Sequence, residues 1–171
     1  MRHFVYFSST ARTSGNFDIN DLMKSGRMDI VMHVIINAFF LSHKLRDDVL
    51  LHLVFYGAPD PPKHIEMRIK PETNLSKKDV GNLIKKILYK YKKGEKIEVF
   101  PGCFIEKKSF LSVVDELIRE GKEIILLDIL GNRILSSTSN SIDISKLSNG
   151  VYFIYLETQN GQLLTLEFIK N

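Results

Sequence analysis

The sequence has little from which a covalent or metal-based framework could be built. Its single cysteine, Cys103, excludes an intramolecular disulfide and a metal site made of cysteines. No glycine-rich phosphate loop, metal-ligand cluster or Ser-His-Asp signature is present in the chain. We therefore expect no metal in this protein, and we expect Cys103 to be a small buried side chain rather than a nucleophile.

Long apolar segments are also missing. The longest, residues 49–56, is too short to cross a bilayer, and residues 1–4 lack the apolar stretch that begins a secretion signal. These absences predict a protein without a membrane partner and with a cytoplasmic location.

Apolar residues make up 44% of the chain, which is enough for the core of one domain with an appendage. Positive charge is uneven: residues 1–122 carry 21 Lys and Arg against 15 Asp and Glu, and residues 123–171 carry 3 against 5. This imbalance places any surface for a polyanion such as RNA on the first part. The alternative is that the seven lysines along one helical stretch at 77–93 only solvate an exposed face.

The periodicity of apolar residues changes along the chain. Up to residue 127, strand and helix patterns alternate, which predicts an α/β domain over 1–127 with a mostly parallel sheet and flanking helices. The clearest helix follows Ser76, and another is expected from about Arg27 to His43. Residues 128–171 read as short strands separated by Asn-Gly and Gly-Asn turns, which predicts an antiparallel β-meander tail with a hairpin across 159–161.

Two short segments carry candidate chemistry. Gly26-Arg27-Met28-Asp29 stands at a helix start, where free N–H groups suit a phosphate or base edge; Arg27 could bind phosphate in a forked geometry and Asp29 could accept a proton. The alternative is an Arg–Asp pair that only completes the helix start. His43 and Arg46 follow the same helix, and cations there are favourable even without a function.

Four separated motifs occur in one order. They are Gly-Arg-Met-Asp at 26–29, Phe-Phe-Leu-Ser-His at 39–43 followed by Arg46 and Asp48, Tyr-Gly-Ala-Pro-Asp-Pro-Pro at 56–62, and Pro101-Gly102. This series resembles the archaeal tRNA pseudouridine N1-methyltransferases of the SPOUT superfamily over about residues 1–128. The resemblance implies methyl transfer from S-adenosylmethionine to N1 of a pseudouridine in the tRNA T-loop, carried out by a homodimer.

The same resemblance implies roles for individual residues. Arg27, His43 and Arg46 would bind the RNA and the target base, and Leu127 would approach the methyl donor. As catalytic residues, Asp29 would take or relay the N1 proton while Arg27 stabilised negative charge on the base. His33 stands where the family usually has arginine, which bears on how the RNA is held.

The tail departs from the family. It lacks the Gly-Asp-His type loop, the second loop and the last helix that thread a trefoil knot around the donor, so the cofactor site is expected to be incomplete and turnover slow or absent. Residues 123–171 instead resemble a C-terminal sorting domain of type IX secretion. Two other hypotheses therefore stay open: a catalytically impaired RNA-binding or interaction module in a chimeric or truncated chain, and a secreted cargo protein.

Overall fold

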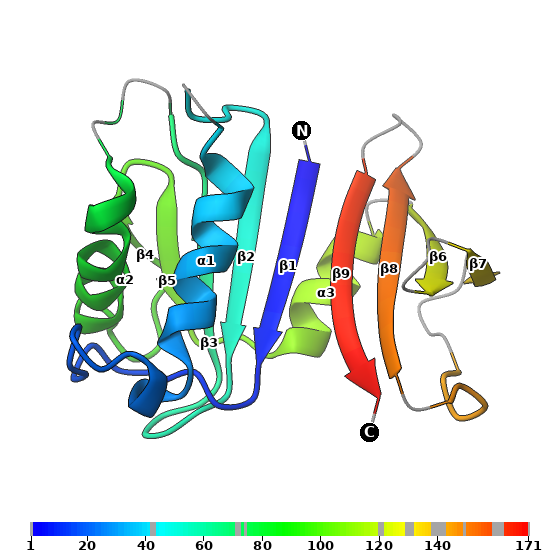
Figure 1. Ribbon diagram of the computed structural model, residues 1–171, viewed down its shortest axis with the longest axis horizontal. Coiled ribbons are helices and arrows are strands. Elements are labelled where there is room, and N and C mark those ends of the chain that lie inside the picture. Colours follow the sequence, from blue (N-terminus) through cyan, green and yellow to red (C-terminus); the bar gives the residue numbers. More distant parts are fainter. Residues whose placement is uncertain are drawn as a thin grey trace.

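The computed structural model describes residues 2–41, 44–70, 73, 75–119, 122–128, 132–137, 143–148, 150–158 and 163–170. Nine strands and three α-helices make up this part, with two short 3-10 helices (Figure 1). In chain order they are β1 (Arg2–Ser8), η1 (Met23–Ser25), α1 (Met28–Phe39), β2 (Val49–Phe55), β3 (Lys63–Met67), η2 (Lys77–Asp79), α2 (Val80–Tyr89), β4 (Ile97–Phe100), β5 (Cys103–Glu106), α3 (Phe110–Arg119), β6 (Lys122–Asp128), β7 (Arg133–Ser137), β8 (Gly150–Thr158) and β9 (Leu163–Lys170).

The α/β class is confirmed, but the prediction of a mostly parallel sheet is wrong. The nine strands form one mixed sheet in the order β4-β5-β3-β2-β1-β9-β8-β6-β7, in which only β1–β2 and β1–β9 pair in parallel. The reason is the length of the connections. A parallel pair needs a crossover of about a dozen residues or more, whereas β2 and β3 are joined by residues 56–62 and β4 and β5 by Pro101-Gly102.

The tail continues the central sheet. The strand pairing of the predicted hairpin is confirmed, because β8 and β9 pair antiparallel from Gly150↔Lys170 to Glu157↔Leu163, whereas its predicted turn at 159–161 lies outside the described residues. β9 then pairs in parallel with β1 over His3↔Leu164 to Val5↔Leu166. Among the described residues beyond 130 only strands and turns occur. The predicted boundary at residue 127 falls within β6 and remains a prediction.

Helices cover both faces of the sheet (Figure 1). α1 and α2 pack on one face through the larger core, to which β2 contributes Leu51, Leu53 and Phe55. α3 packs on the other face, where Val54 of β2 joins Val5 of β1 and two α3 side chains. This division follows from the alternation of side chains along a strand, which sends neighbouring residues to opposite faces. None of the helices in the described part of the chain is long and apolar enough to cross a membrane.

Helix α1 ends at Phe39 rather than near His43. Phe40 leaves the helical conformation, with φ −95° and ψ 117°, and forms an isolated β-bridge with Leu45. Because α1 connects the parallel strands β1 and β2, it must run back across the sheet between them. Its first residue therefore lies near the carboxyl ends of these strands, and its last residue lies near their amino ends.

Two loops meet at the carboxyl ends of β1 and β2. Gly57 donates its N–H to the carbonyl of Ala11 at 3.1 Å, and Thr13 donates its hydroxyl to the carbonyl of Gly57 at 2.8 Å. The approach is close enough that a Cβ built on Gly57 would lie 2.2 Å from the Thr10 carbonyl oxygen. These contacts make the two loops one continuous piece of structure.

A buried lysine fixes the proline-rich loop between β2 and β3. Lys63 is fully buried, and its Nζ donates to both the carbonyl oxygen and the Oδ2 atom of Asp60 at 2.6 Å. Nζ also lies 3.8 Å from the centre of the Tyr91 ring. Burial lowers the pKa of Lys63, whereas hydrogen bonds from Lys107 and Lys63 lower the pKa of Asp60 to about 2. The ion pair with Asp60 opposes the effect of burial and favours the charged form of Lys63.

Replacing Gly57 with alanine should destabilise the protein strongly. The added methyl group would overlap two backbone carbonyls, and the loops would have to separate, which we expect to cost about 2–4 kcal/mol. Gly94→Ala is the control, because open space surrounds Gly94 and only its φ of +86° opposes a side chain, a cost of about 1 kcal/mol. Urea unfolding of both variants measures the difference; equal costs would show that the close approach is not needed.

Asp60→Asn should destabilise the protein at neutral pH and have a much smaller effect near pH 2. Asp60 has a folded pKa of about 2 against an ordinary 3.8, so its carboxylate stabilises the fold fully above pH 4 and loses this effect as pH falls toward 2. The carboxylate is half exposed, which reduces the expected difference to about 1 kcal/mol.

Urea unfolding of wild type and variant between pH 7 and pH 2 measures this difference, since every other titrating group is shared. Asp115→Asn, at an exposed position on α3, is the control and should leave stability within about 0.5 kcal/mol of wild type. A gap between wild type and Asp60→Asn that persisted unchanged at pH 2 would contradict the assignment.

Candidate functional site

The carboxyl edge of β1 has the geometry of a binding site. β1 pairs with β2 over seven residues but with β9 over three, and β9 curves away from β1 toward the carboxyl ends of both strands (Figure 1). In α/β sheets, ligands bind outside the carboxyl ends of strands where neighbouring strands part. The amino end of α1 lies at this same edge, but the N–H groups of Met28 and Ile30 there already donate to the carbonyls of Leu22 and Arg27, at 3.1 and 3.0 Å. Ligand binding at this end would therefore depend mainly on side chains.

Arg27 begins α1 in an unusual backbone conformation. Its φ is 62° and its ψ 40°, and it is the non-glycine residue with positive φ in the described part of the chain. Gly26 before it also has a positive φ of 72°, and a Cβ there would lie 1.9 Å from the carbonyl oxygen of Thr10. Positive φ is uncommon for a side-chain-bearing residue, and such conformations cluster at functional positions. The loop after β1 thus forces Arg27 to the exposed tip of the helix.

Arg27 and Asp29 form a forked ion pair. Nε of Arg27 donates to Oδ1 of Asp29 at 3.0 Å and Nη2 donates to Oδ2 at 3.0 Å. These hydrogen bonds lower the pKa of Asp29 and raise the pKa of Arg27. Arg27 is exposed and Asp29 is half-buried, so a ligand can reach both. The same pairing was predicted by the alternative in which Arg27 and Asp29 only complete the start of the helix. While it is paired with Arg27, Asp29 is a weak base.

The other predicted site residues are placed apart from this pair. Arg46 follows α1 at the opposite edge of the sheet, and a helix of 12 residues is about 18 Å long. Leu127 lies near the carboxyl end of β6, at the same edge as Arg27, but β9 and β8 stand between β6 and β1, a separation of about 14 Å. His43 lies outside the described residues. The structure therefore brings together Arg27 and Asp29 only.

An aromatic group at the carboxyl edge was missed by the sequence analysis. Phe7 at the end of β1 is 39% exposed, and its ring centre lies 5.2 Å from those of Tyr56 and Phe110. The hydroxyl of Tyr56 accepts the N–H of Phe110 at 3.1 Å, which ties the loop after β2 to the start of α3. Nucleobases stack on such rings. Tyr56 lies inside a recognised motif, but its two partners come from distant segments and gave no local signal.

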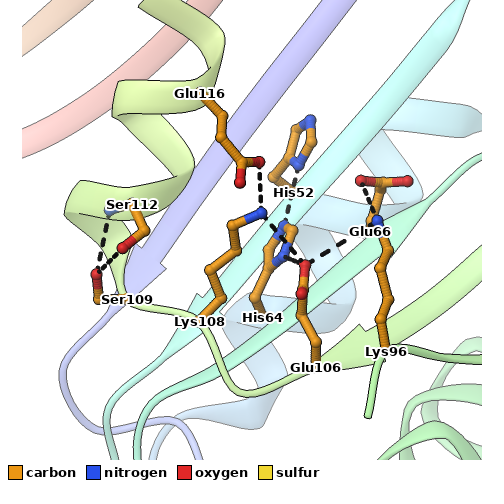
Figure 2. A network of polar contacts seen from close by, with 9 residues as sticks. All are labelled: His52, His64, Glu66, Lys96, Glu106, Lys108, Ser109, Ser112 and Glu116. Carbon is orange, nitrogen blue, oxygen red and sulfur yellow. Dashed lines mark hydrogen bonds and ion pairs between the residues drawn. The ribbon is translucent and has the colours of Figure 1, made fainter. Parts of the chain in front are cut away.

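A polar network on the α3 face was also missed (Figure 2). His52 of β2 and His64 of β3 are buried, with Nδ1 of His52 3.0 Å from Nε2 of His64, and Nδ1 of His64 lies 3.0 Å from Oε1 of Glu106. Burial lowers the pKa of His52 to about 2, and the hydrogen bond from His64 lowers the pKa of Glu106 to about 2. Glu66 lies beside the two imidazoles, and the donor atoms of His52, His64 and Glu66 are within 4.8 Å of one another.

The two histidines are separated along the chain and meet only through the register of β2 and β3. A signal was present nevertheless, because His52, His64 and Glu66 alternate with apolar residues on either side of one short loop.

Several archaeal proteins are similar to this chain. One from Methanococcoides burtonii is 36% identical over 157 residues, covering 90% of this chain and 74% of that protein. One from Methanococcus aeolicus is 37% identical, covering 74% of this chain and 64% of that protein. One from Thermococcus gammatolerans is 35% identical, covering 67% of this chain and 60% of that protein. All three are named "tRNA (pseudouridine(54)-N(1))-methyltransferase". Against the last two, the chain spans less than two thirds of the relative's length.

A family model described as "Putative SAM-dependent RNA methyltransferase" matches residues 1–145. The match runs past the expected limit at 128 and includes part of the tail, and the resemblance of the tail to a secretion sorting domain receives no support from these comparisons. Both the family model and the archaeal relatives match most of the length of this chain. The chain therefore belongs to the family of S-adenosylmethionine-dependent RNA methyltransferases that includes the archaeal tRNA pseudouridine N1-methyltransferases.

Proposed function

We propose that this chain is a cytoplasmic tRNA methyltransferase that methylates N1 of a pseudouridine in the T-loop, at the position 54 that the names of its relatives give. The observation that carries the proposal is the Arg27–Asp29 pair at the amino end of α1. This pair combines an exposed cation and a carboxylate at the carboxyl edge of the sheet, where the resemblance to the family requires them.

The chemistry requires a proton to leave as the methyl group arrives. N1 of pseudouridine is a weak acid. S-adenosylmethionine, when bound, would supply an electrophilic methyl group for N1. The N1 proton passes to the carboxylate of Asp29, and the guanidinium of Arg27 stabilises the negative charge that develops on the base oxygens. Placing the base in line with the methyl group supplies much of the rate.

The ion pair couples these two roles. While Arg27 holds Asp29, the pKa of the carboxyl group is lowered and it is a poor base. When the target nucleobase enters, one of its oxygens would attract the guanidinium of Arg27 away from Asp29. The pKa of Asp29 would then rise toward its ordinary value. Binding of the tRNA would thus make Asp29 a better proton acceptor when the N1 proton has to leave.

The donor would occupy the space outside the carboxyl ends of β1 and β9. The exposed faces of Phe7 and its aromatic neighbours suit both a sulfonium cation and an adenine ring. Leu127, at the same edge on β6, is the cofactor contact that the resemblance implies. We further propose a homodimer, because Arg46 follows the far end of α1 and, with His43 as its proposed RNA-binding partner, would serve either another part of the tRNA or the site of a second subunit.

A second candidate function is an RNA-binding module with impaired catalysis. It is favoured by the strands that follow β6, since the described residues beyond β6 contain no helix. Calorimetric titration with S-adenosylmethionine, followed by a radiolabelled methyl-transfer assay on pseudouridine-containing tRNA, separates the two. Micromolar donor binding with multiple turnovers supports the enzyme, whereas tRNA binding without donor binding supports the module.

Arg27→Ala should weaken tRNA binding or methyl transfer far more than Lys90→Ala. Arg27 makes a directed, charge-assisted contact worth about 1.5–3 kcal/mol, which corresponds to roughly tenfold to more than a hundredfold. Lys90, exposed at the end of α2, contributes only diffuse charge. Fluorescence anisotropy with labelled tRNA and the methyl-transfer assay measure both variants. Equal losses would show that overall basicity, and not this motif, governs RNA contact.

A further inference from the structure

We propose that His52, His64 and Glu66 form a binding site for a divalent transition metal ion such as zinc. The three side chains (Figure 2) lie on the same face of the sheet as α3, opposite α1 and α2. His52 is in the middle of β2, whereas Arg27 and Asp29 lie at the carboxyl edge of the sheet. Its function would be to join β2 to β3, and it is independent of the methyl-transfer chemistry.

The strand register builds the site. His52 of β2 is directly opposite Glu66 of β3, and His64 is opposite Val54, so the three candidate ligands protrude on the same face of one antiparallel pair. The two ring nitrogens are 3.0 Å apart, and all three donor atoms lie within 4.8 Å of one another. Zinc binds histidine nitrogen and carboxylate oxygen at about 2.0–2.2 Å in a tetrahedral arrangement, so small side-chain rotations would bring all three donors into reach.

Glu106 prepares His64 to act as a ligand. A carboxylate only accepts hydrogen bonds, so the 3.0 Å contact requires the proton of the His64 ring to be on Nδ1. The lone pair of Nε2 is then directed toward His52. Histidines that bind metals usually make this kind of hydrogen bond to a carboxylate through their other nitrogen, which fixes the ring and its tautomer.

His52 can change its tautomer at the cost of its hydrogen bond to His64 alone. Without a metal its Nδ1 donates to His64, so its Nε2 carries the lone pair, and this buried nitrogen has no hydrogen-bond partner in the protein. When Nδ1 binds a metal, the proton can be carried on Nε2 instead. The buried His52 ring therefore has Nδ1 directed toward the other proposed metal ligand, His64, and Nε2 without a hydrogen-bond partner among the described side chains.

Access also suits a cation, whereas the charge around the site is balanced, because Lys108 Nζ lies 3.4 Å from Oε1 of Glu106. The histidines are 5% and 1% exposed, but Glu66 is only half-buried and opens the site to solvent. Lys96 occupies this opening, with Nζ 3.2 Å from Glu66 and 4.0 Å from Glu106. Its side chain is exposed, and Nζ also lies 5.0 Å from the centre of the Phe104 ring, so metal binding would require it to give up these contacts. A metal ion would take the position of this ammonium group beside Glu66.

Metal titration of the full chain tests the proposal. Protein freed of metal with a chelator is titrated with Co²⁺, whose visible absorption reports tetrahedral coordination, and with Zn²⁺ by calorimetry. We expect one ion per chain. His64→Gln should reduce the affinity by at least about a hundredfold, the upper end of what outer-shell changes cost, and Glu66→Gln by about tenfold. The matched control His33→Gln changes an exposed histidine on α1 and should leave the affinity unchanged.

Lys96→Met provides a test in the opposite direction. Removing the competing ammonium group should raise the affinity by about tenfold. This variant and Glu66→Gln alter side chains at the solvent opening, so they keep the test valid if His64→Gln fails to fold. No saturable Co²⁺ absorption, or an affinity that none of these three changes alters, would overturn the proposal and leave Glu106, His64 and His52 as a hydrogen-bonded chain alone. These readouts do not involve tRNA or the methyl donor.

Discussion

The close contact between the loops that follow β1 and β2 is the constraint on which the candidate site depends. Gly57 approaches the backbone of Thr10 and Ala11 so closely that no side chain fits, and Gly26 approaches the same carbonyl from the other side. The hydroxyl of Thr10 also donates to the carbonyl of Gly26 at 3.2 Å. The amino end of α1 is therefore held against the carboxyl edge of the sheet by backbone contacts, and the position of Arg27 follows from them.

Much of the fold could be predicted from local patterns. The alternation of apolar residues located most strands, and the turn residues between Val151 and Ile169 predicted the β8–β9 hairpin that is observed. The direction of the strands was harder, because it depends on how far each connection must reach. The sheet partner of β9 was not predictable locally either, since β1 lies at the other end of the chain.

The candidate site was predicted only where its residues are close together in the sequence. Arg27 and Asp29 are two residues apart, so a local motif captured both the ion pair and its structural alternative. Arg46 was grouped with them by sequence motif, yet the length of α1 places it at the opposite edge of the sheet. The aromatic group around Phe7 and the buried pair of His52 and His64 are assembled by tertiary packing and strand register, which a single sequence does not display.

The position of β1 between β2 and β9 also has a consequence for how the protein folds. β1 can pair with β2 once α1 has formed between them, but its other edge must wait for a strand encoded more than 150 residues later. Contacts of such long sequence separation slow folding, because much of the chain must be ordered before they form. In the interval, one edge of the central strand is open to pairing with another chain, so the speed with which β8 and β9 dock governs how much of the newly made protein aggregates.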